Sequence, residues 1–263
     1  MSGAPARYAI IGDPVAHSLS PRMQQAAFHA LGLAATYEAR RVTRAALPRT
    51  LEMLRAAAFA GWNVTTPLKE AIIPLLDGCT SEAQAARSVN TVRRESSGRY
   101  VGHDTDGAGL VRAVRAIWDF DVAGKSVVLF GSGPASRAIA RALRSASVGK
   151  LRCWSRNAQA SAAIAPAPDG VADLVVSLLP AGATVPPEAL FCIGGATRVF
   201  DANYASAGAS VPPGFGGPRS DGLPLLLHQG ALAFEWWTGG DAPLGAMTAA
   251  LAAPLKLLRP TGR

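Results

Sequence analysis

Residues 126–138 read SVVLFGSGPASRA, and this stretch decides the fold. A compact apolar run ends at Phe130 and passes directly into Gly131-Ser132-Gly133, and an alanine-rich segment then continues to about Ala146. A strand followed by a glycine turn and a helix is typical of a mononucleotide-binding unit, in which the free amides at the helix start attract a pyrophosphate. Because Ser136 replaces the third glycine of the usual fingerprint, a plain turn between strand and helix remains the alternative.

The end of the next expected strand, 151–154, indicates which dinucleotide would bind. NAD-binding sites usually carry an acidic residue there, whereas this chain has Ser155-Arg156-Asn157. An arginine at this place can pair with the 2′-phosphate of NADP, so we expect NADP, with NAD less favoured. The alternative is a solvated arginine in an arginine-rich chain. The expected cofactor residues are Gly131, Ser132, Gly133, Pro134, Ala135, Ser155, Arg156 and Asn157.

Strands and helices alternate along the rest of the chain. The first hundred residues predict strands at 8–11, 36–41 and 62–64, helices starting at Ser20-Pro21 and spanning 44–58, and paired strands at 90–95 and 99–103. This is a βαβαβ rhythm followed by a hairpin, and Ser20 is expected to cap its helix. The remainder predicts helices at 107–118, 134–146, 223–237 and 242–258, and strands at 126–130, 151–154, 173–179 and 198–203.

The composition excludes several classes of protein. With 49% hydrophobic residues among 263, the chain can bury a core, so disorder is not its main state. The net charge of +8 comes mostly from scattered arginines, which argues against a nucleic-acid surface. Three cysteines without CxxC spacing and four histidines without zinc-site spacing predict a reducing compartment and no metal. We find no membrane-spanning run and no signal-like start, and therefore expect a cytoplasmic protein.

Three polar clusters interrupt the apolar pattern near expected strand ends. They are residues 18–20, residues 63–69, and Asn90-Thr91 together with residues 104–107. Ligands bind at the carboxyl ends of strands in open α/β sheets, so these clusters are candidate binding residues. Each also has a structural alternative: helix capping for Ser20 and Asp104, a turn at Asn63, and a solvated lysine at Lys69.

Taken together and in order, five motifs resemble the shikimate dehydrogenase family. The resembling stretches are 11–21 (IGDPVAHSLSP), 61–69 (GWNVTTPLK), 89–92 (VNTV), 102–107 (GHDTDG), and 222–229 (GLPLLLHQ) with 233–235 (AFE). The motifs extend over most of the chain and keep the order of the family. Five ordered motifs are far more specific than one glycine loop.

The resemblance implies a role for each matched residue. Lys69 matches the catalytic lysine of the family, and an ammonium beside a ketone can stabilise the developing alkoxide and then donate its proton. Asp106 would hold that lysine in place and keep it charged. Ser18 and Ser20 match serines that hold the substrate carboxylate. The groups that match holders of ring hydroxyls are Asn63, Thr65, Asn90, Asp106 and Gln229; Tyr204 matches a tyrosine of the same cleft, and Gly222 joins the cofactor residues.

The expected fold class is α/β with two domains. Residues 1–104 and 226–263 would form an N-terminal α/β substrate domain completed by the returning C-terminal helices, and residues 105–225 a Rossmann-like NADP-binding domain. The resemblance implies an oxidoreductase of chorismate and aromatic amino acid biosynthesis, which reduces 3-dehydroshikimate to shikimate with NADPH, as a monomer or homodimer.

Two alternatives stay open at this point. One is a quinate/shikimate or aminoshikimate-type dehydrogenase that uses NAD or NADP, and the discriminating feature is Arg156. The other is a non-catalytic relative that binds a ligand or cofactor without turnover. The presence of both Lys69 and Asp106 favours an enzyme, because a binding module does not need a proton donor.

The chain departs from the family pattern at several positions. Arg87-Ser88 stands where glycine-alanine usually precedes the Val-Asn-Thr run, and Asp104 replaces an asparagine. In the cofactor half the departures are the glycine-poorer loop 131–134, Ser155 in place of asparagine, and residues 177–180 in place of Asn-Ala-Thr-Pro. The stretch between Trp154 and Asp173 is short, so we expect a usual helix and strand to be reduced there.

Overall fold

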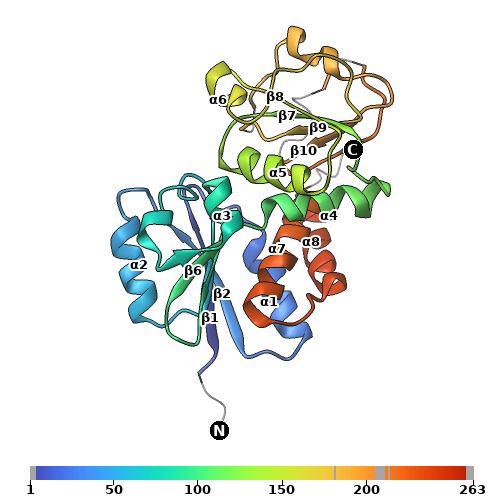
Figure 1. The fold of residues 1–263 in the computed structure, drawn as a ribbon. Helices are drawn as coiled ribbons and strands as arrows, with labels where there is room; N and C mark the ends of the chain where they lie inside the picture. Colours follow the sequence, from blue (N-terminus) through green and yellow to red (C-terminus); the bar gives the residue numbers. More distant parts are fainter. Residues whose placement is uncertain (1–3, 181, 205–210, 213, 259–263) are drawn as a thin grey trace. The chain divides into compact units, whose positions relative to one another are not determined.

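The computed structural model describes residues 4–180, 182–204, 211–212 and 214–258 of the chain. It divides into two compact units (Figure 1): unit 1 is Met1–Thr105 with Gln229–Arg263, and unit 2 is Asp106–His228. Helix α7 (Leu223–Thr238) begins in unit 2 and ends in unit 1. Within the described ranges, no helix is long and apolar enough to cross a membrane.

Unit 1 is built on a six-stranded mixed sheet in the order β2-β1-β3-β5-β6-β4. Its strands are β1 (Ala6–Gly12), β2 (Ala35–Arg41), β3 (Gly61–Val64), β4 (Gly78–Cys79), β5 (Thr91–Arg94) and β6 (Tyr100–His103). The parallel pairing of β1 with both β2 and β3 confirms the βαβαβ prediction, and β5 and β6 form the expected antiparallel pair. Strand β4 was not predicted, because a two-residue strand shows no periodicity.

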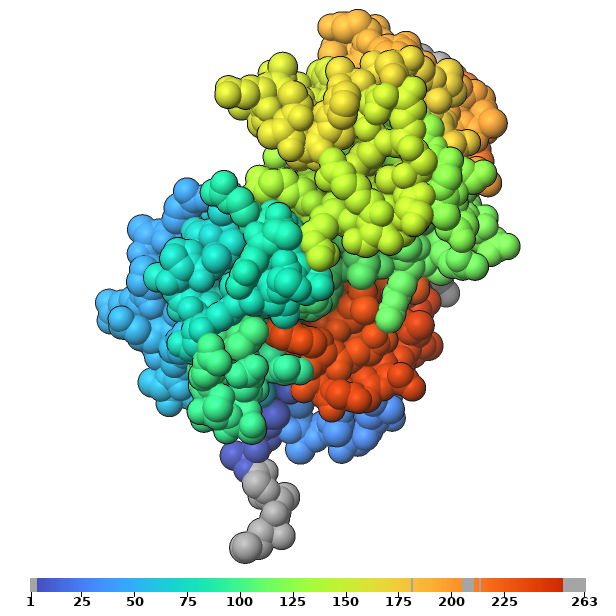
Figure 2. All heavy atoms as spheres, in the orientation of Figure 1, coloured from blue at the N-terminus to red at the C-terminus, as the bar shows by residue number. Residues whose placement is uncertain are grey.

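Helices cover both faces of this sheet (Figure 1). They are α1 (Ser20–Ala30), α2 (Leu47–Ala56), α3 (Ser81–Ala86), α8 (Leu244–Leu258) and the second part of α7. Three leucines of α2 pack on one face in a cluster with Ile11 and Trp62. On the other face α1 packs against α8, and the Tyr8 ring stacks on Phe28 of α1 with 4.9 Å between centroids. In the space-filling view the red C-terminal segment lies against the blue N-terminal residues of unit 1 (Figure 2).

The start of α1 differs from the prediction. The expectation that Ser20 caps α1 is wrong, because the cap position is Leu19, which makes no side-chain hydrogen bond, and Ser20 is already helical. A capping hydroxyl must stand one residue before the helix to reach its free amides. Instead, the Ser18 hydroxyl accepts a hydrogen bond from the Ser20 amide at 3.2 Å. The buried Ser20 side chain therefore needs another explanation.

Unit 2 is built on a five-stranded parallel sheet in the order β11-β10-β9-β7-β8. Its strands are β7 (Ser126–Phe130), β8 (Lys150–Trp154), β9 (Leu174–Ser177), β10 (Arg198–Asp201) and β11 (Arg219–Ser220). The chain passes from β7 to β8 on one side and then places β9 on the other side of β7. In open α/β sheets, ligands bind outside the carboxyl ends of the strands at such a reversal.

Alternate residues of β7 face opposite sides of its sheet. Val127 and Leu129 pack in a cluster with apolar residues of α4 (Asp106–Trp118) and α5 (Pro134–Ser145). Val128 and Phe130 pack instead with the short helical segment Pro187–Cys192. Because both faces are covered, the strand is a continuous apolar run rather than an alternating one, as parallel sheets require.

The connection between β8 and β9 is reduced, as expected. Residues 155–173 contain one five-residue helix, α6 (Ala158–Ala162), and no strand. Strand β9 also ends earlier than predicted, at Ser177, because its pairing partner β7 ends at Phe130. The helix predicted at 44–58 is likewise shorter, since its first turn contains Pro48 and the chain turns out of the helix at Ala58 with φ of +51°.

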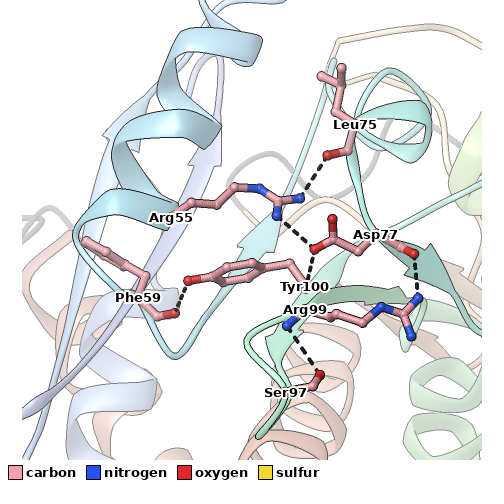
Figure 3. Close-up of polar contacts among 7 residues, drawn as sticks. All are labelled: Arg55, Phe59, Leu75, Asp77, Ser97, Arg99 and Tyr100. Carbon is pink, nitrogen blue, oxygen red and sulfur yellow. Dashed lines mark hydrogen bonds and ion pairs between the residues drawn. The ribbon is translucent and has the colours of Figure 1, made fainter.

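A charged network ties α2 to the chain that leads into β4 and to β6 (Figure 3). The Asp77 carboxylate accepts hydrogen bonds from the Arg55 guanidinium at 2.8 Å and from the Tyr100 amide at 2.6 Å. Arg55 also donates to the Leu75 carbonyl at 3.1 Å and lies 4.9 Å from the centroid of the Tyr100 ring. The hydrogen bond from Arg55, followed by that from Tyr100, holds the pKa of Asp77 below its usual value.

Replacing Asp77 with asparagine should lower the free energy of unfolding by about 1 kcal/mol, because Arg55 loses a charged acceptor at a partly exposed site. The pKa of Asp77 is lowered in the folded protein from 3.8. The carboxylate therefore makes its full contribution to the free energy of unfolding above pH 3.8, and this contribution is lost as the pH falls through the pKa of the folded state. Urea unfolding should give the same difference in the free energy of unfolding between wild type and variant at about pH 7 and about pH 5, and a smaller difference at about pH 3. A difference that does not change with pH would show that the carboxylate charge is not involved.

Candidate functional site

The carboxyl ends of β1 and β3 meet at one edge of the unit 1 sheet. The Thr65 amide donates to the Ile11 carbonyl at 2.9 Å, and the Asp13 amide donates to the Thr66 carbonyl at 2.9 Å. A side chain at Gly12 would collide with the Thr65 methyl group, so this approach requires glycine. Because β1 lies between β2 and β3, this edge is the reversal point at which such sheets bind ligands.

Asn63 and Asn90 connect this edge to the antiparallel strands. Asn63 lies on β3 and is buried, so the interpretation of Asn63 as a turn residue is wrong. Its Nδ2 donates to the Asn90 carbonyl at 3.1 Å, and the same carbonyl accepts from the Val64 amide at 2.8 Å. Its Oδ1 accepts from the Tyr37 hydroxyl at 2.6 Å. The Asn63 amide group is thus held at both ends.

The Asn90 side chain connects two further segments. Its Oδ1 accepts from the Thr105 amide at 2.9 Å, and its Nδ2 donates to Thr105 Oγ1 at 2.9 Å. The same Nδ2 donates to Gln229 Oε1 at 3.4 Å, and Thr105 Oγ1 donates to the Gln229 carbonyl at 2.9 Å. Three of the predicted substrate residues, Asn63, Asn90 and Gln229, therefore belong to one network, which is buried at Asn63 and Asn90 and partly exposed at Gln229, although they lie far apart in sequence.

Lys69 and Ser20 lie next to this network. The Lys69 carbonyl accepts from the Val89 amide at 2.9 Å, so the backbone of Lys69 runs beside the residue that precedes Asn90. Lys69 is half-buried and is not a fully solvated lysine. Burial raises the pKa of Tyr37 well above its usual value, and a hydrogen bond with Ser20 lowers it in part. The hydroxyl of Ser20 is therefore close to that of Tyr37.

Tyr37 is a member of the network that sequence reasoning missed. It lies on the edge strand β2, whose other residues are mostly exposed or partly exposed. Its side chain is only 7% exposed. A tyrosine among charged neighbours is a weak signal in a sequence, because it predicts packing as readily as binding. Only the register of three strands reveals that its hydroxyl meets Asn63.

Two of the predicted catalytic and substrate residues, Asp106 and Tyr204, belong to unit 2. Asp106 is buried and opens α4, where a carboxylate also interacts favourably with the helix dipole. Tyr204 follows β10 and is half-buried. Thr65, by contrast, belongs to unit 1 and is placed by its backbone at the meeting point of β1 and β3.

The glycine loop after β7 has the backbone that pyrophosphate binding requires. Gly131 has φ of +113°, and a side chain on it would lie 3.2 Å from the Leu178 carbonyl oxygen. Gly133 is the N-cap of α5, Pro134 is its first residue, and no side-chain cap is formed there by the described residues. The amides of the first turn of α5 are therefore available to an anion.

Cys153 lies beneath this loop. Its thiol donates a hydrogen bond to the Gly131 carbonyl at 3.4 Å. Burial raises the pKa of the Cys153 thiol to about 11. The thiol therefore stays neutral near pH 7 and adds no negative charge that would repel a phosphate from the loop.

The turn after β8 is shaped by its two polar neighbours. Asn157 caps α6 by accepting from the Ala160 amide at 3.0 Å, and the Ser155 hydroxyl donates to the Asn157 carbonyl at 2.8 Å. Arg156 lies between them and is exposed. Ser155 and Asn157 therefore have structural roles in a turn that presents a guanidinium to solvent, which suits a phosphate group.

Gly222 is required by packing, because a side chain there would collide with the Ala202 carbonyl that follows β10. Its backbone amide donates to the Asn203 carbonyl at 3.2 Å.

A metal site requires several ligand side chains close together. In the parts of the chain that the structure describes, no group of three histidine, cysteine, aspartate or glutamate residues is arranged to hold a metal ion.

The departures from the family pattern in unit 1 are connected in space. Arg87 has φ of +49°, the left-handed region that favours the glycine usual at this position. Ser88 donates its hydroxyl to Asp104 Oδ2 at 2.6 Å. Ser88 is fully buried and Asp104 is 8% exposed, so water cannot easily replace this donor. Because an alanine at position 88 would offer no hydrogen bond, Ser88 and Asp104 form a matched pair.

The chain thus combines a parallel sheet that carries a nucleotide-type glycine loop with an amide network beside a lysine, which is the arrangement of a two-unit α/β protein of the nucleotide-binding class. Two family models match the chain: the shikimate dehydrogenase substrate binding domain at residues 10–92 and the shikimate 5′-dehydrogenase C-terminal domain at residues 222–252. A shikimate dehydrogenase (NADP(+)) of Desulfitobacterium hafniense is 34% identical over 93% of this chain and 96% of its own length. The chain belongs to the shikimate dehydrogenase family, which confirms the resemblance found in its motifs.

Solved structures share the whole fold. Shikimate 5-dehydrogenase from Thermus thermophilus, in complex with NADP(H) and shikimate, is 35% identical with a TM-score of 0.84, over 93% of this chain and 98% of that one. Quinate dehydrogenase from Corynebacterium glutamicum, in complex with NAD, is 27% identical with a TM-score of 0.81, over 95% and 100%. These similarities confirm the predicted α/β fold class.

Ser88→Ala should lower the free energy of unfolding by about 1–3 kcal/mol, because a buried carboxylate oxygen loses its donor. Adding Asp104→Asn should recover part of this loss, since a neutral amide is easier to bury than a carboxylate that has lost a hydrogen-bond donor. Chemical unfolding of the wild type, both single variants and the double variant measures the coupling energy. Ser96→Ala, at an exposed turn position, is the control. Strictly additive losses would show that the two side chains do not depend on each other.

Proposed function

We propose that this chain catalyses the reversible, NADPH-dependent reduction of 3-dehydroshikimate to shikimate. The observation that carries the proposal is the network of Asn63, Asn90 and Gln229, beside the backbone of Lys69. Amide groups held by hydrogen bonds can recognise ring hydroxyls, and a lysine can supply charge and a proton. The relative named as an NADP(+) shikimate dehydrogenase, and the Thermus complex with NADP(H) and shikimate, support the same activity.

The chemistry of the chain itself is a proton transfer that accompanies hydride transfer. NADPH, when bound, supplies the hydride that the ketone carbon accepts. In this proposal Lys69 acts at the ketone oxygen, where its ammonium stabilises the developing negative charge and donates the proton that completes the alcohol. Asp106 acts with Lys69 as the carboxylate that keeps the ammonium charged. In the oxidation of the alcohol, neutral Lys69 accepts the same proton.

The rest of the substrate is held by residues of unit 1. Ser18 and Ser20 bind its carboxylate, which is supported by their hydrogen bond at the beginning of α1, where the helix dipole favours negative charge. The ring hydroxyls are assigned to Asn63, Thr65, Asn90, Asp106 and Gln229, and Tyr204 is assigned to the same ligand.

The cofactor is assigned to the domain formed by residues 105–225, and the substrate to residues 1–104 with 226–263. The glycine loop at the reversal between β7 and β9, and the uncapped start of α5, fit a pyrophosphate. Exposed Arg156 after β8, where an NAD site would carry a carboxylate, fits a 2′-phosphate. The cofactor residues are Gly131, Ser132, Gly133, Pro134, Ala135, Ser155, Arg156, Asn157 and Gly222.

A quinate/shikimate dehydrogenase that uses NAD is the second candidate, because the Corynebacterium quinate dehydrogenase in complex with NAD has the same fold. Absorbance of the reduced cofactor, measured with shikimate or quinate and with NADP⁺ or NAD⁺, separates the two. Absence of turnover with every pair would favour a non-catalytic relative.

A cytoplasmic location and a monomeric or homodimeric state also stay predictions.

Lys69→Met should reduce kcat by about 10²–10⁴-fold with little change in the KM for shikimate, because methionine keeps the side-chain size and removes the proton donor. Asp106→Asn should also be severe, and the double variant should be little worse than the worse single variant if the two residues act as a unit. Steady-state kinetics test this, with Lys125→Met as a control at an exposed lysine. A near-normal kcat for Lys69→Met would refute the mechanism.

Arg156→Ala should weaken NADP⁺ binding by about 5–100-fold, because a charge-assisted contact to the 2′-phosphate is lost. Binding of NAD⁺, which lacks that phosphate, should stay nearly unchanged. Fluorescence titration of both cofactors measures this. Arg115→Ala is a matched control, since Arg115 is an exposed arginine of α4 that pairs with Asp121 at 3.1 Å. Tighter binding of NAD⁺ than of NADP⁺ to the wild type would overturn the assignment of Arg156.

A further inference from the structure

We propose that Tyr37 is a positioning residue that holds the Asn63 side-chain amide in the orientation selected by the Asn90 carbonyl, and so keeps Asn63 a hydrogen-bond donor to a hydroxyl oxygen of the substrate. This inference rests on the proposed function, because it concerns how the same site recognises its ligand. Tyr37 is not among the residues that the sequence motifs single out.

The strand register brings Tyr37 and Asn63 to one face of the sheet. Tyr37 on β2 is opposite Tyr8 on β1, and Asn63 on β3 is opposite Ile10 on β1. Tyr8 and Ile10 are two positions apart on one strand, so they share a face, and their partners share it too. This is the face covered by α1, since Tyr8 stacks on Phe28 of that helix. The Tyr37 side chain reaches across β1 to meet Asn63.

The Asn90 carbonyl decides which way the Asn63 amide faces. A carbonyl oxygen only accepts hydrogen bonds, so the Asn63 group 3.1 Å from the Asn90 oxygen must be Nδ2. Oδ1 then lies 2.6 Å from the Tyr37 hydroxyl, which must be the donor. The reverse orientation would place two acceptors together at Asn90. Tyr37 therefore completes an arrangement that has only one satisfied form.

This arrangement leaves one N–H donor of the Asn63 side chain for a ligand. The side-chain amide has two N–H donors, and one of them is used by the Asn90 carbonyl. The other makes no hydrogen bond to any residue in the described ranges. Oδ1 is already taken by Tyr37. Asn63 therefore offers a donor, and the matching ligand group is an oxygen lone pair, such as that of a ring hydroxyl.

Tyr37 keeps its hydroxyl proton near pH 7 and so remains a hydrogen-bond donor. It is buried, and burial raises the pKa of Tyr37 well above its usual value, an effect that the hydrogen bond with Ser20 only partly offsets. The phenol therefore does not act as a general base. Because its neighbours include both Ser20 and Asn63, it also ties a residue assigned to the substrate carboxylate to one assigned to a ring hydroxyl.

The test is the hydroxyl deletion Tyr37→Phe, compared with Tyr8→Phe. Both tyrosines lie on the same face and pack against the ring of Trp237, with centroids 6.2 Å and 4.9 Å away, but only Tyr37 contacts Asn63. Tyr37→Phe should raise the KM for shikimate about tenfold, with kcat and the KM for NADP⁺ changed less than about threefold, because it loosens a group remote from the proton transfer. Tyr8→Phe should leave all three parameters near the wild-type values.

A double-mutant cycle with Asn63→Ala distinguishes positioning from general damage. If Tyr37 acts through Asn63, adding Tyr37→Phe to Asn63→Ala should raise the KM for shikimate no further. Multiplied effects, an unchanged KM in Tyr37→Phe, or an equal rise in Tyr8→Phe would overturn the inference. If Tyr37→Phe does not fold, the variant Asn63→Asp is measured in its place. Its carboxylate still accepts a hydrogen bond from Tyr37 but cannot donate one to the substrate. An unchanged KM for shikimate in this variant would overturn the inference.

The activity of the wild-type protein distinguishes a failure of this inference from a failure of the proposed function. A wild type that does not oxidise shikimate with NADP⁺ refutes the proposed function, and a wild type that does so while the cycle is additive refutes only the role of Tyr37. The two failures therefore give different results in the same assay.

Discussion

Asn90 is the residue on which the rest of unit 1 depends, because its hydrogen bonds join its own segment to three others. Its backbone carbonyl accepts hydrogen bonds from the Val64 amide and the Asn63 side chain of β3, and its backbone amide donates to the His103 carbonyl of β6. Its side chain binds Thr105 and Gln229. An apolar residue at position 90 would leave several buried polar groups without partners, each at a cost of about 1–3 kcal/mol. The same bonds that hold the segments together therefore arrange the amides that a ligand would meet.

A polar network of this kind is rigid because it is buried and satisfied. Asn63, Asn90 and Thr105 are each at most 5% exposed, so few waters are present to replace a missing partner. Hydrogen bonds in such surroundings select one arrangement of donors and acceptors and exclude others. That property suits the recognition of hydroxyl groups, which differ mainly in position, because a misplaced hydroxyl leaves a buried donor unpaired. The glycine at position 12 serves the same end by letting β1 and β3 approach closely.

The sequence was sufficient for features that depend on local pattern, and insufficient for those that depend on register. The glycine loop, the alternation of strands and helices and the ordered motifs all follow from neighbouring residues. The Tyr37 contact and the Ser88–Asp104 pair join residues 26 and 16 positions apart, which no periodicity links. Ser20 was misjudged for a related reason: serine before proline predicts a cap, but the helix starts one residue earlier and buries the hydroxyl. The roles of the site residues themselves follow from the family resemblance and stay predictions.

The two units share one architectural device at the edges of their sheets. In each, the first strand lies between two parallel neighbours, and a glycine at its end (Gly12 of β1) or directly after it (Gly131 after β7) closely approaches the chain just after the third strand. The chemistry that follows differs. Unit 1 places side-chain amides and hydroxyls there, which can be arranged individually and so match a small ligand with many hydroxyls. Unit 2 places backbone amides at the start of α5, and such amides can bind a phosphate by charge and geometry without any particular side chain. The two arrangements therefore differ in their sensitivity to substitution. Substituting Ser132 or Ser136 changes side chains while the backbone donors remain, whereas substituting Asn63 or Asn90 removes the donors themselves.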